Sequence, residues 1–275
     1  MSWKGRLELN YRLQGERTVA QDRHTGPLRV LKALYPPLTR DCHHVLVHPP
    51  GGLAGGDELE IALHQDSGTQ VLITTPGATR FYRSLGPLAL QDVSIRLEGD
   101  ARLQWLPLES LAYGGCHAEN RLLFELGPAA QMMGWDMLSL GLPAAEDSFD
   151  RGQFVQHLEC PGLWLERGRL DAHDVLLRES PLGLAGHRVM GTLWFAQGHD
   201  WDAKMLEEAL ATARELIAKA ADVPAAATAP NPQVLVVRAL SHRVEPLFQL
   251  FKAIRDQWHR VVWAEEAVQP RLWAT

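Results

Sequence analysis

Apolar and polar residues alternate along most of the first 200 positions of the chain. The segment ELEIALH, residues 58–64, places Leu59, Ile61 and Leu63 on one face and Glu60 and His64 on the other. The same alternation recurs at 93–99, 102–109, 120–127, 152–160, 163–173 and 187–196. Turn residues separate these segments every 10 to 15 residues or so, without intervening helices. Short, numerous strands of this kind favour a sandwich, a barrel or stacked sheets over alternating strand–helix units.

The hydrophobic period changes near residue 200. From 200 to 221 the apolar side chains follow a helical stripe: Met205, Leu206, Ala209, Leu210, Ala213, Leu216, Ile217 and Ala220. Asp200 or Asp202 can cap this helix. The strand VLVVRAL (234–240) follows, and a second helix begins at Pro246 and carries Leu247, Leu250, Phe251, Ile254 and Trp258 on one face.

These patterns predict a mainly β fold with stacked sheets, β-helix-like or sandwich-like, and two α-helices in the C-terminal third. We expect a single domain over 1–275, with a β-rich body over 1–200 and a helix–strand–helix part over 201–275. The Ala/Pro-rich stretch at about 222–233 is predicted to be an exposed linker.

Composition narrows the class of protein. The formal net charge of -6 provides no basic excess, so a nucleic-acid partner is disfavoured. No apolar run approaches the roughly 20 residues of a membrane helix, and the N-terminal segment lacks the apolar core of a signal peptide. The three cysteines are odd in number and form no CxxC pair, so neither a disulfide framework nor a zinc ribbon is indicated. We therefore expect a cytoplasmic protein.

The stretch HPPGGLAGGD, residues 48–57, resembles a phosphate-binding loop in the spacing of Gly51 and Gly56. Such a loop needs a lysine where Asp57 stands, and it opens a helix rather than the strand that follows here. A phosphate role is therefore disfavoured. A tight glycine turn explains the glycines but does not demand an acid at Asp57.

Histidines and cysteines suggest metal contact without a closed site. Asp41, Cys42, His43, His44 and His48 cluster in a predicted strand. His44 and His48 share a face but lie about 13 Å apart, so one ion cannot bind both. Scattered ligands of this kind suit weak, transient contact with a borderline metal, although ordinary core and surface histidines remain the alternative.

No familiar catalytic motif is present. Ser84 and Ser110 have no nearby base, and neither G-x-S-x-G nor H-E-x-x-H occurs. Residues 74–84, TTPGATRFYRS, combine hydroxyl, arginine and tyrosine side chains around a Pro-Gly turn. They suit a partner interface or a polar channel wall.

Several blocks together resemble the UreD (also called UreH) urease accessory protein family. They are LVHPPGGLAGGDELEIALHQDSGTQVLITTPGATRFYRS, WLPLESLAYGGCHAENRLLFEL, MGWDMLSLGLPAAEDSFDRGQF, WLERGRLDAHDVLL, GLAGHRVMGTL and the terminal QPRLWAT. The resemblance covers nearly the whole chain in the same order. It implies a mostly β fold with two helices and a non-enzymatic role.

The resemblance also implies partners and a cargo. Members of the family bind the urease apoprotein and UreF, and through UreF the GTPase UreG; a homodimer of such heteromers is possible. No cofactor is implied to be permanently bound, but transient Ni²⁺ is. The matching motifs nominate Asp57, Ser84, Asp136 and Glu166 as a nickel path, with His48 and Glu109 in second rank.

Two alternatives stay open. Asp136 and Glu166 can instead be buried acids paired with an arginine, for which Arg167 and Arg169 are the candidates. The function can also be that of an all-β small-molecule-binding hydrolase whose active site is assembled in space. Cys116 and His117, where the family pattern leads us to expect other residues, leave a metal-binding specialisation open.

Overall fold

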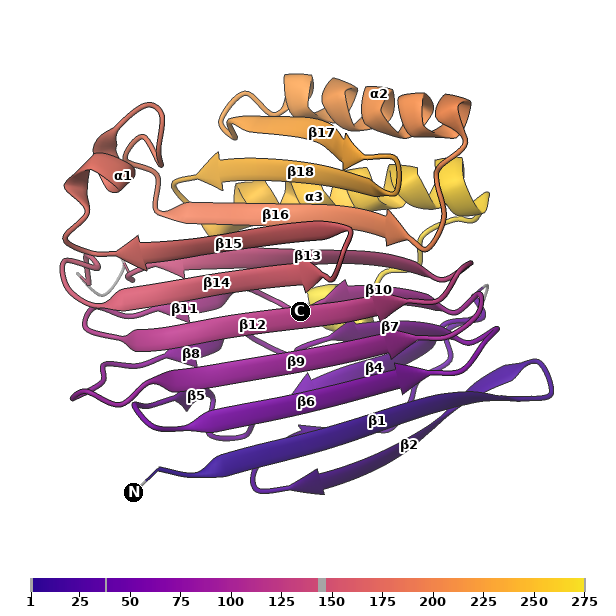
Figure 1. The fold of residues 1–275 in the computed structure, drawn as a ribbon, viewed down its shortest axis with the longest axis horizontal. Helices are drawn as coiled ribbons and strands as arrows, with labels where there is room; N and C mark the ends of the chain where they lie inside the picture. Colours follow the sequence, from indigo (N-terminus) through magenta and orange to yellow (C-terminus); the bar gives the residue numbers. More distant parts are fainter. Residues whose placement is uncertain (1, 38, 143–146, 275) are drawn as a thin grey trace.

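Two β-sheets face each other, and helices cover the outer face of one of them (Figure 1). The computed structural model describes residues 2–37, 39–142 and 147–274. Within these ranges the first sheet has the strand order β15-β14-β12-β9-β6-β1-β2. Its strands are β1 (Lys4–Gln14), β2 (Arg17–Thr25), β6 (Glu58–Gln65), β9 (Ala89–Leu97), β12 (His117–Leu126), β14 (Gln153–Cys160) and β15 (Trp164–Asp171).

The second sheet has the order β17-β18-β16-β13-β10-β7-β4-β3. Its strands are β3 (Arg29–Val30), β4 (Cys42–Val47), β7 (Gln70–Thr74), β10 (Arg102–Leu106), β13 (Gln131–Leu140), β16 (Val189–Gln197), β17 (Ala225–Asn231) and β18 (Val234–Ser241). The short strands β5 (Gly52–Leu53), β8 (Thr79–Phe81) and β11 (Ser110–Ala112) branch from it, because β11 pairs with β13.

The chain winds as a solenoid between the sheets. The chain passes repeatedly from the first sheet to the second and back, and β5, β8 and β11 lie on the return to β6, β9 and β12. As a result β6, β9, β12 and β14 lie parallel in one sheet. In the other sheet β4, β7, β10 and β13 lie parallel in the same way. The prediction of a mainly β, β-helix-like fold is therefore confirmed.

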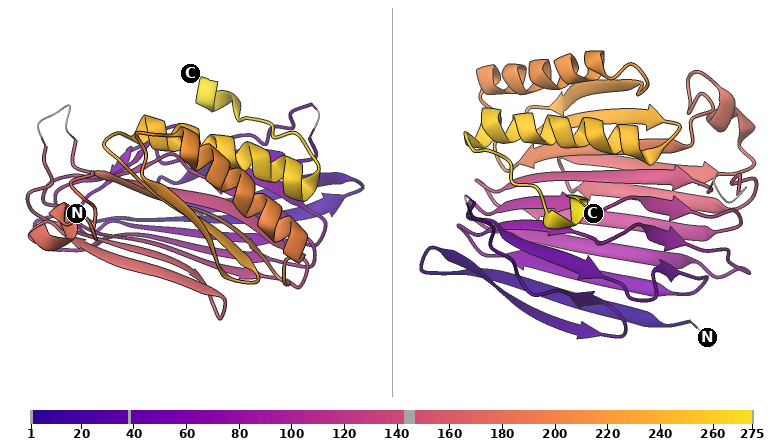
Figure 2. Two further views of the ribbon diagram at one scale, coloured as in Figure 1. Left: turned by 90° about the horizontal axis from the view of Figure 1, so that it is seen from above. Right: turned by 180° about the vertical axis from the view of Figure 1, so that it is seen from behind.

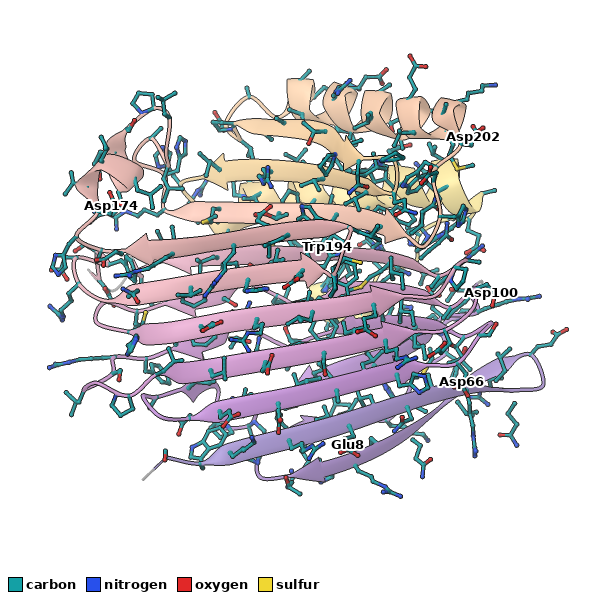
Figure 3. The ribbon with its side chains drawn as sticks, viewed as in Figure 1. Glu8, Asp66, Asp100, Asp174, Trp194 and Asp202 are labelled. Atoms are coloured by element: carbon teal, nitrogen blue, oxygen red, sulfur yellow. The ribbon has the colours of Figure 1, made fainter. Side chains whose placement is uncertain are left out.

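Hydrogen bonds connect the turns of successive coils. The Asp100 carboxylate accepts hydrogen bonds from Ser67 Oγ at 2.6 Å and from the Gly68 backbone N–H at 2.7 Å. These bonds join the turn that follows β9 to the turn that follows β6. Figure 3 shows Asp66 and Asp100 together at one end of the strands, with Asp174 at the opposite end.

The space between the sheets is the main core, and it consists of the inward positions of the alternating strands. Leu59, Ile61 and Leu63 are buried there, as the sequence pattern predicts. Farther along, Trp194 stacks on Phe124 with ring centroids 6.0 Å apart. The outer face of the first sheet carries charged side chains such as Glu8 and faces the viewer in Figure 3.

The helices make a third layer on the second sheet (Figure 2). They are α2 (Ala203–Lys219) and α3 (Val244–Trp258), and a π-helical turn (His259–Trp263) continues α3. Both predicted helices are confirmed, and Asp202 caps α2 by accepting from two backbone N–H groups. The short helix α1 (Val175–Glu179), which the sequence pattern did not indicate, lies apart from them (Figure 1). A 3₁₀ turn, Arg271–Ala274, ends the described chain.

The prediction of an exposed linker at about 222–233 is wrong. Residues 225–231 form strand β17 at the edge of the second sheet. The register of β17 on β18 shifts between Thr228 and Asn231, a stretch that contains Pro230. An edge strand with a bulge accommodates proline, which lacks a backbone donor. The same composition that suggested a loop is therefore compatible with an edge strand.

Candidate functional site

A row of amide side chains interrupts the apolar core between the sheets. Gln91, Asn120 and Gln156 lie directly opposite one another on β9, β12 and β14. Gln91 Nε2 donates to Asn120 Oδ1 at 2.9 Å, and Asn120 Nδ2 lies 3.4 Å from Gln156 Oε1. Polar groups in an interior cost free energy unless they are hydrogen-bonded, and the ladder pairs its amides across three coils. One atom stays unpaired among the described residues, because Gln156 Nε2 is buried without a hydrogen-bond partner.

Asp136 faces this ladder from the second sheet. Asn120 Nδ2 donates to Asp136 Oδ2 at 2.9 Å. Burial raises the pKa of the Asp136 carboxyl to about 7, and the negative charge of Glu166 adds to the shift. Among the residues that the structure describes, Asp136 pairs with the Asn120 amide and with no arginine. The side chain is half-buried, and its raised pKa lies close to neutral pH.

Glu166 lies beyond Asp136, where β15 faces β16 and β18. Thr192 Oγ1 donates to Glu166 Oε1 at 2.6 Å, and Arg238 Nε donates to Glu166 Oε2 at 2.7 Å. The predicted arginine pairing is thus present, but its partner is neither Arg167 nor Arg169. Both lie an odd number of residues from Glu166 on one strand, so they point to the opposite face.

We call this set the polar seam. It consists of Gln91, Asn120, Asp136, Gln156, Glu166, Thr192 and Arg238. The seam crosses the strands, from the middle of the solenoid toward β15, the edge strand of the first sheet, and β18, the strand next to the edge of the second. Because its members come from both sheets, it brings together Asp136 and Glu166, two of the acids that the sequence motifs nominate.

Two cavities continue the seam on its other side. A cavity of about 20 Å³ is lined by Asp136, Asn120 and Ser110 among others, and this volume holds about one water molecule. A larger cavity of about 210 Å³ opens near His48 and Arg80. The two share the lining residues Thr79, Gln91, Trp105 and Pro107, so they adjoin. A substrate pocket for a hydrolase would need far more room beside Asp136.

Asp57 shapes the glycine turn. Its side chain is buried and accepts hydrogen bonds from the backbone N–H groups of Trp3 at 3.2 Å and Ala54 at 2.9 Å. His48 lies close by, and its ring packs on Trp3 with centroids 5.0 Å apart. Burial lowers the pKa of His48, while the charge of Asp57 opposes that shift. Asp57 therefore holds the N-terminal strand against the turn and lies beside His48.

Ser84 and Glu109 stand outside the seam. Ser84 Oγ donates to the Pro87 carbonyl at 2.5 Å, within a turn that packs on Gly55. A Cβ at Gly55 would lie 2.1 Å from Ser84 Oγ, so this position requires glycine. Neither Ser84, Asp57 nor Glu109 is among the residues that line the two adjoining cavities. The structure thus places the six nominated residues in separate groups.

The histidine-rich strand β4 is packed into the protein. His43 and His44 are buried, and burial lowers the pKa of each to about 4. Tyr11 Oη lies 2.7 Å from His44 Nδ1. Cys116 faces the core and His117 faces outward, as strand alternation requires. In the described part of the chain, no three His, Cys, Asp or Glu side chains are grouped to hold a metal ion.

The amide ladder, Thr192 and Arg238 are the seam residues that the sequence motifs did not identify. A signal was present for the amides. In each of β9, β12 and β14, one amide interrupts an otherwise apolar inward face. Arg238 offered no such signal, because it is a single charge within a strongly apolar strand and its partner lies 72 residues earlier.

Fold and site together define a β-solenoid protein with a polar seam through its apolar core and a helical layer on one sheet. The sequence profile of the UreD urease accessory proteins matches residues 4–274. The "Urease accessory protein UreD" of Leptothrix cholodnii is 52% identical over the full length of both chains. Those of Albidiferax ferrireducens and Variovorax paradoxus are 52% and 50% identical, again over both full lengths. The chain belongs to the UreD urease accessory protein family.

No helix in residues 2–37, 39–142 and 147–274 combines the length and apolarity that crossing a bilayer requires.

The unusual pKa of Asp136 leads to a pH-dependent stability prediction. The folded pKa of about 7 exceeds the ordinary aspartate value of 3.8, so the stabilising contribution of protonation is fully present below about pH 3.8 and is lost as pH rises through 7. Asp136→Asn removes this dependence. We expect the free energy of unfolding of the variant, relative to that of the wild type, to increase by about 2 kcal/mol when the pH rises from 5 to 8.5. Urea denaturation at both pH values measures the difference, and a pH-independent difference would contradict the assignment.

Proposed function

We propose that this protein acts in urease maturation as a non-catalytic scaffold. It binds the urease apoprotein and UreF, and through UreF the GTPase UreG, in the cytoplasm. Nickel crosses the scaffold along the polar seam as cargo in transit and is not retained as a cofactor. Family membership supports the setting, since the relatives are named as urease accessory proteins.

The observation that carries the proposal is the polar seam. A divalent ion in an apolar interior would be unpaired, at a cost of many kcal/mol. The seam offers amide oxygens, one hydroxyl and the carboxylates of Asp136 and Glu166 in sequence. Oxygen ligands spaced singly hold an ion weakly, as a conducting path requires.

The small cavities support the same proposal. The 20 Å³ cavity at Asp136 has the volume of about one water molecule, so a single ion or water fits beside the carboxylate. The adjoining 210 Å³ cavity leads from there toward His48. Of the two second-rank candidates, His48 lines the larger cavity and therefore lies on this route. Glu109 lines neither cavity.

Co-expression of the urease subunits and the other accessory proteins, with and without this chain, tests the proposal. We expect urease purified without it to lack nickel, and urease purified with it to be loaded. A pull-down with the tagged chain should retain the urease apoprotein and UreF. Fully nickel-loaded urease from cells that lack the chain would contradict the proposal.

A further inference from the structure

The outer end of the polar seam is closed by an ion pair whose two members differ in exposure. Arg238 Nε lies 2.7 Å from Glu166 Oε2, and a second guanidinium nitrogen lies 2.6 Å from the same oxygen. The Glu166 side chain is 17% exposed and the Arg238 side chain 59%. The carboxylate is therefore turned into the protein, while the cation that neutralises it reaches in from the surface.

The strand register places Arg238 at the end of one row. Asp136 lies opposite Thr192 across β13 and β16, and Thr192 lies opposite Arg238 across β16 and β18. Directly opposed residues in antiparallel strands project from the same face of the sheet. The row therefore runs from the half-buried acid Asp136 through the Thr192 hydroxyl to the guanidinium. Glu166 bridges the last two members from the facing sheet.

We propose that Arg238 is a gating residue of the seam. Its guanidinium is a tethered cation that occupies Glu166 when no metal ion is present, and it must swing outward before a divalent cation can bind there. The inference rests on the proposed function, because it assumes that ions use the seam. It adds a component that family membership does not supply: the residue that controls access at this end.

Charge and exposure both support a gate. A guanidinium and a divalent cation repel each other, so they cannot share one carboxylate at hydrogen-bonding distance. The exposed guanidinium is hydrated as it swings outward, and the incoming divalent cation replaces its charge at the less exposed carboxylate, so Glu166 is not left unpaired. The Thr192 hydroxyl stays with Glu166 when Arg238 leaves, and it keeps the carboxylate oriented. A purely structural ion pair has no need of this asymmetry.

Metal binding to the purified full-length chain tests the gate directly. Arg238→Gln removes the competing charge and leaves Glu166, Thr192 and Asp136 in place. We expect this variant to bind Ni²⁺ about tenfold or more tightly than the wild type in equilibrium dialysis. The double variant Arg238→Gln/Glu166→Gln should lose the gain. Arg238→Lys, which restores a positive charge, should return the affinity toward the wild-type value.

Arg167→Gln is the matched control, because Arg167 is adjacent to Glu166 on β15 but points to the opposite face. It should leave nickel affinity unchanged. Unchanged affinity in Arg238→Gln, or equal gains in Arg167→Gln, would overturn the gate. If urease activation still requires Glu166 in that case, the seam stands and only the gate fails. If activation survives both Glu166→Gln and Asp136→Asn, the proposed path itself is wrong.

Discussion

Replacement of Arg255 by methionine should lower the free energy of unfolding by about 3–5 kcal/mol. The Arg255 side chain is fully buried between α3 and the second sheet. Its guanidinium donates to Gln104 Oε1 at 2.9 and 2.7 Å and to the Val268 carbonyl at 3.0 Å. Methionine fills similar space but donates nothing, so the Val268 carbonyl loses this donor and Gln104 Oε1 keeps only His259 Nε2, which lies 2.8 Å away. Chemical denaturation with far-UV circular dichroism measures the loss.

A second consequence concerns Asp41, which accepts from Gln104 Nε2 at 2.9 Å. Burial raises the pKa of Asp41 to about 6, and the charge of Arg255 opposes that rise. Without the guanidinium, the Asp41 pKa should rise further. This part of the destabilisation is therefore larger at pH 8 than at pH 5, because at pH 8 the carboxylate must be ionised without its counter-charge.

Arg260→Met provides the matched control for Arg255→Met. Arg260 follows α3 closely and pairs with Glu266, but both side chains are exposed. Its loss should leave the free energy of unfolding nearly unchanged, because water screens an exposed ion pair. If the free energies of unfolding of the two variants differ by less than about 1 kcal/mol, the buried hydrogen bonds of Arg255 do not contribute to stability as we infer. The double variant with Gln104→Met should cost less than the sum of the two single losses, since the two residues share their hydrogen bonds.

Arg255 also helps to hold the segment 264–274 against the second sheet. Arg255 holds the Val268 carbonyl, and Trp273 Nε1 donates to Thr74 Oγ1 at 3.2 Å. The Trp273 ring packs against Trp135 with centroids 5.3 Å apart. Amide hydrogen exchange over residues 264–274 should therefore accelerate in Arg255→Met even where the solenoid stays folded.

The solenoid was largely predictable because its signal is local. Strand alternation over residues such as Leu59, Ile61 and Leu63 identifies an inward face directly, and the helical stripes identify α2 and α3. The linker prediction failed at Pro230, because the tolerance of an edge strand for proline depends on neighbours that local composition does not reveal.

The seam was predictable only in part, since its contacts are distant in sequence. Motif resemblance nominated Asp136 and Glu166, and the structure brings them near each other, because Asp136 lies opposite Thr192 and Thr192 donates to Glu166. Their partners Asn120, Thr192 and Arg238 come from other coils, so periodicity within one strand cannot pair them. Local reasoning even chose Arg167 and Arg169 for Glu166, although strand alternation turns both away.

Asp136→Asn and Glu166→Gln should each reduce nickel-dependent urease activation by about tenfold or more. Each change removes one carboxylate from the seam and keeps the shape of the side chain, so the solenoid and its partner surfaces should remain intact. The measurement is urease activity and nickel content after co-expression, together with a pull-down of UreF and the urease apoprotein. Assembly should be normal while nickel content falls.

Asp92→Asn and Glu159→Gln are the matched controls for these two variants. Asp92 follows the inward-facing Gln91 on β9, and Glu159 follows the inward-facing Leu158 on β14. The side chains of Asp92 and Glu159 therefore lie on the outer face of the first sheet. Both controls should retain activation, because the charge they lose lies outside the seam. If Asp136→Asn and Glu166→Gln activate urease as well as these controls do, the two acids serve only the stability of the solenoid and nickel takes another route.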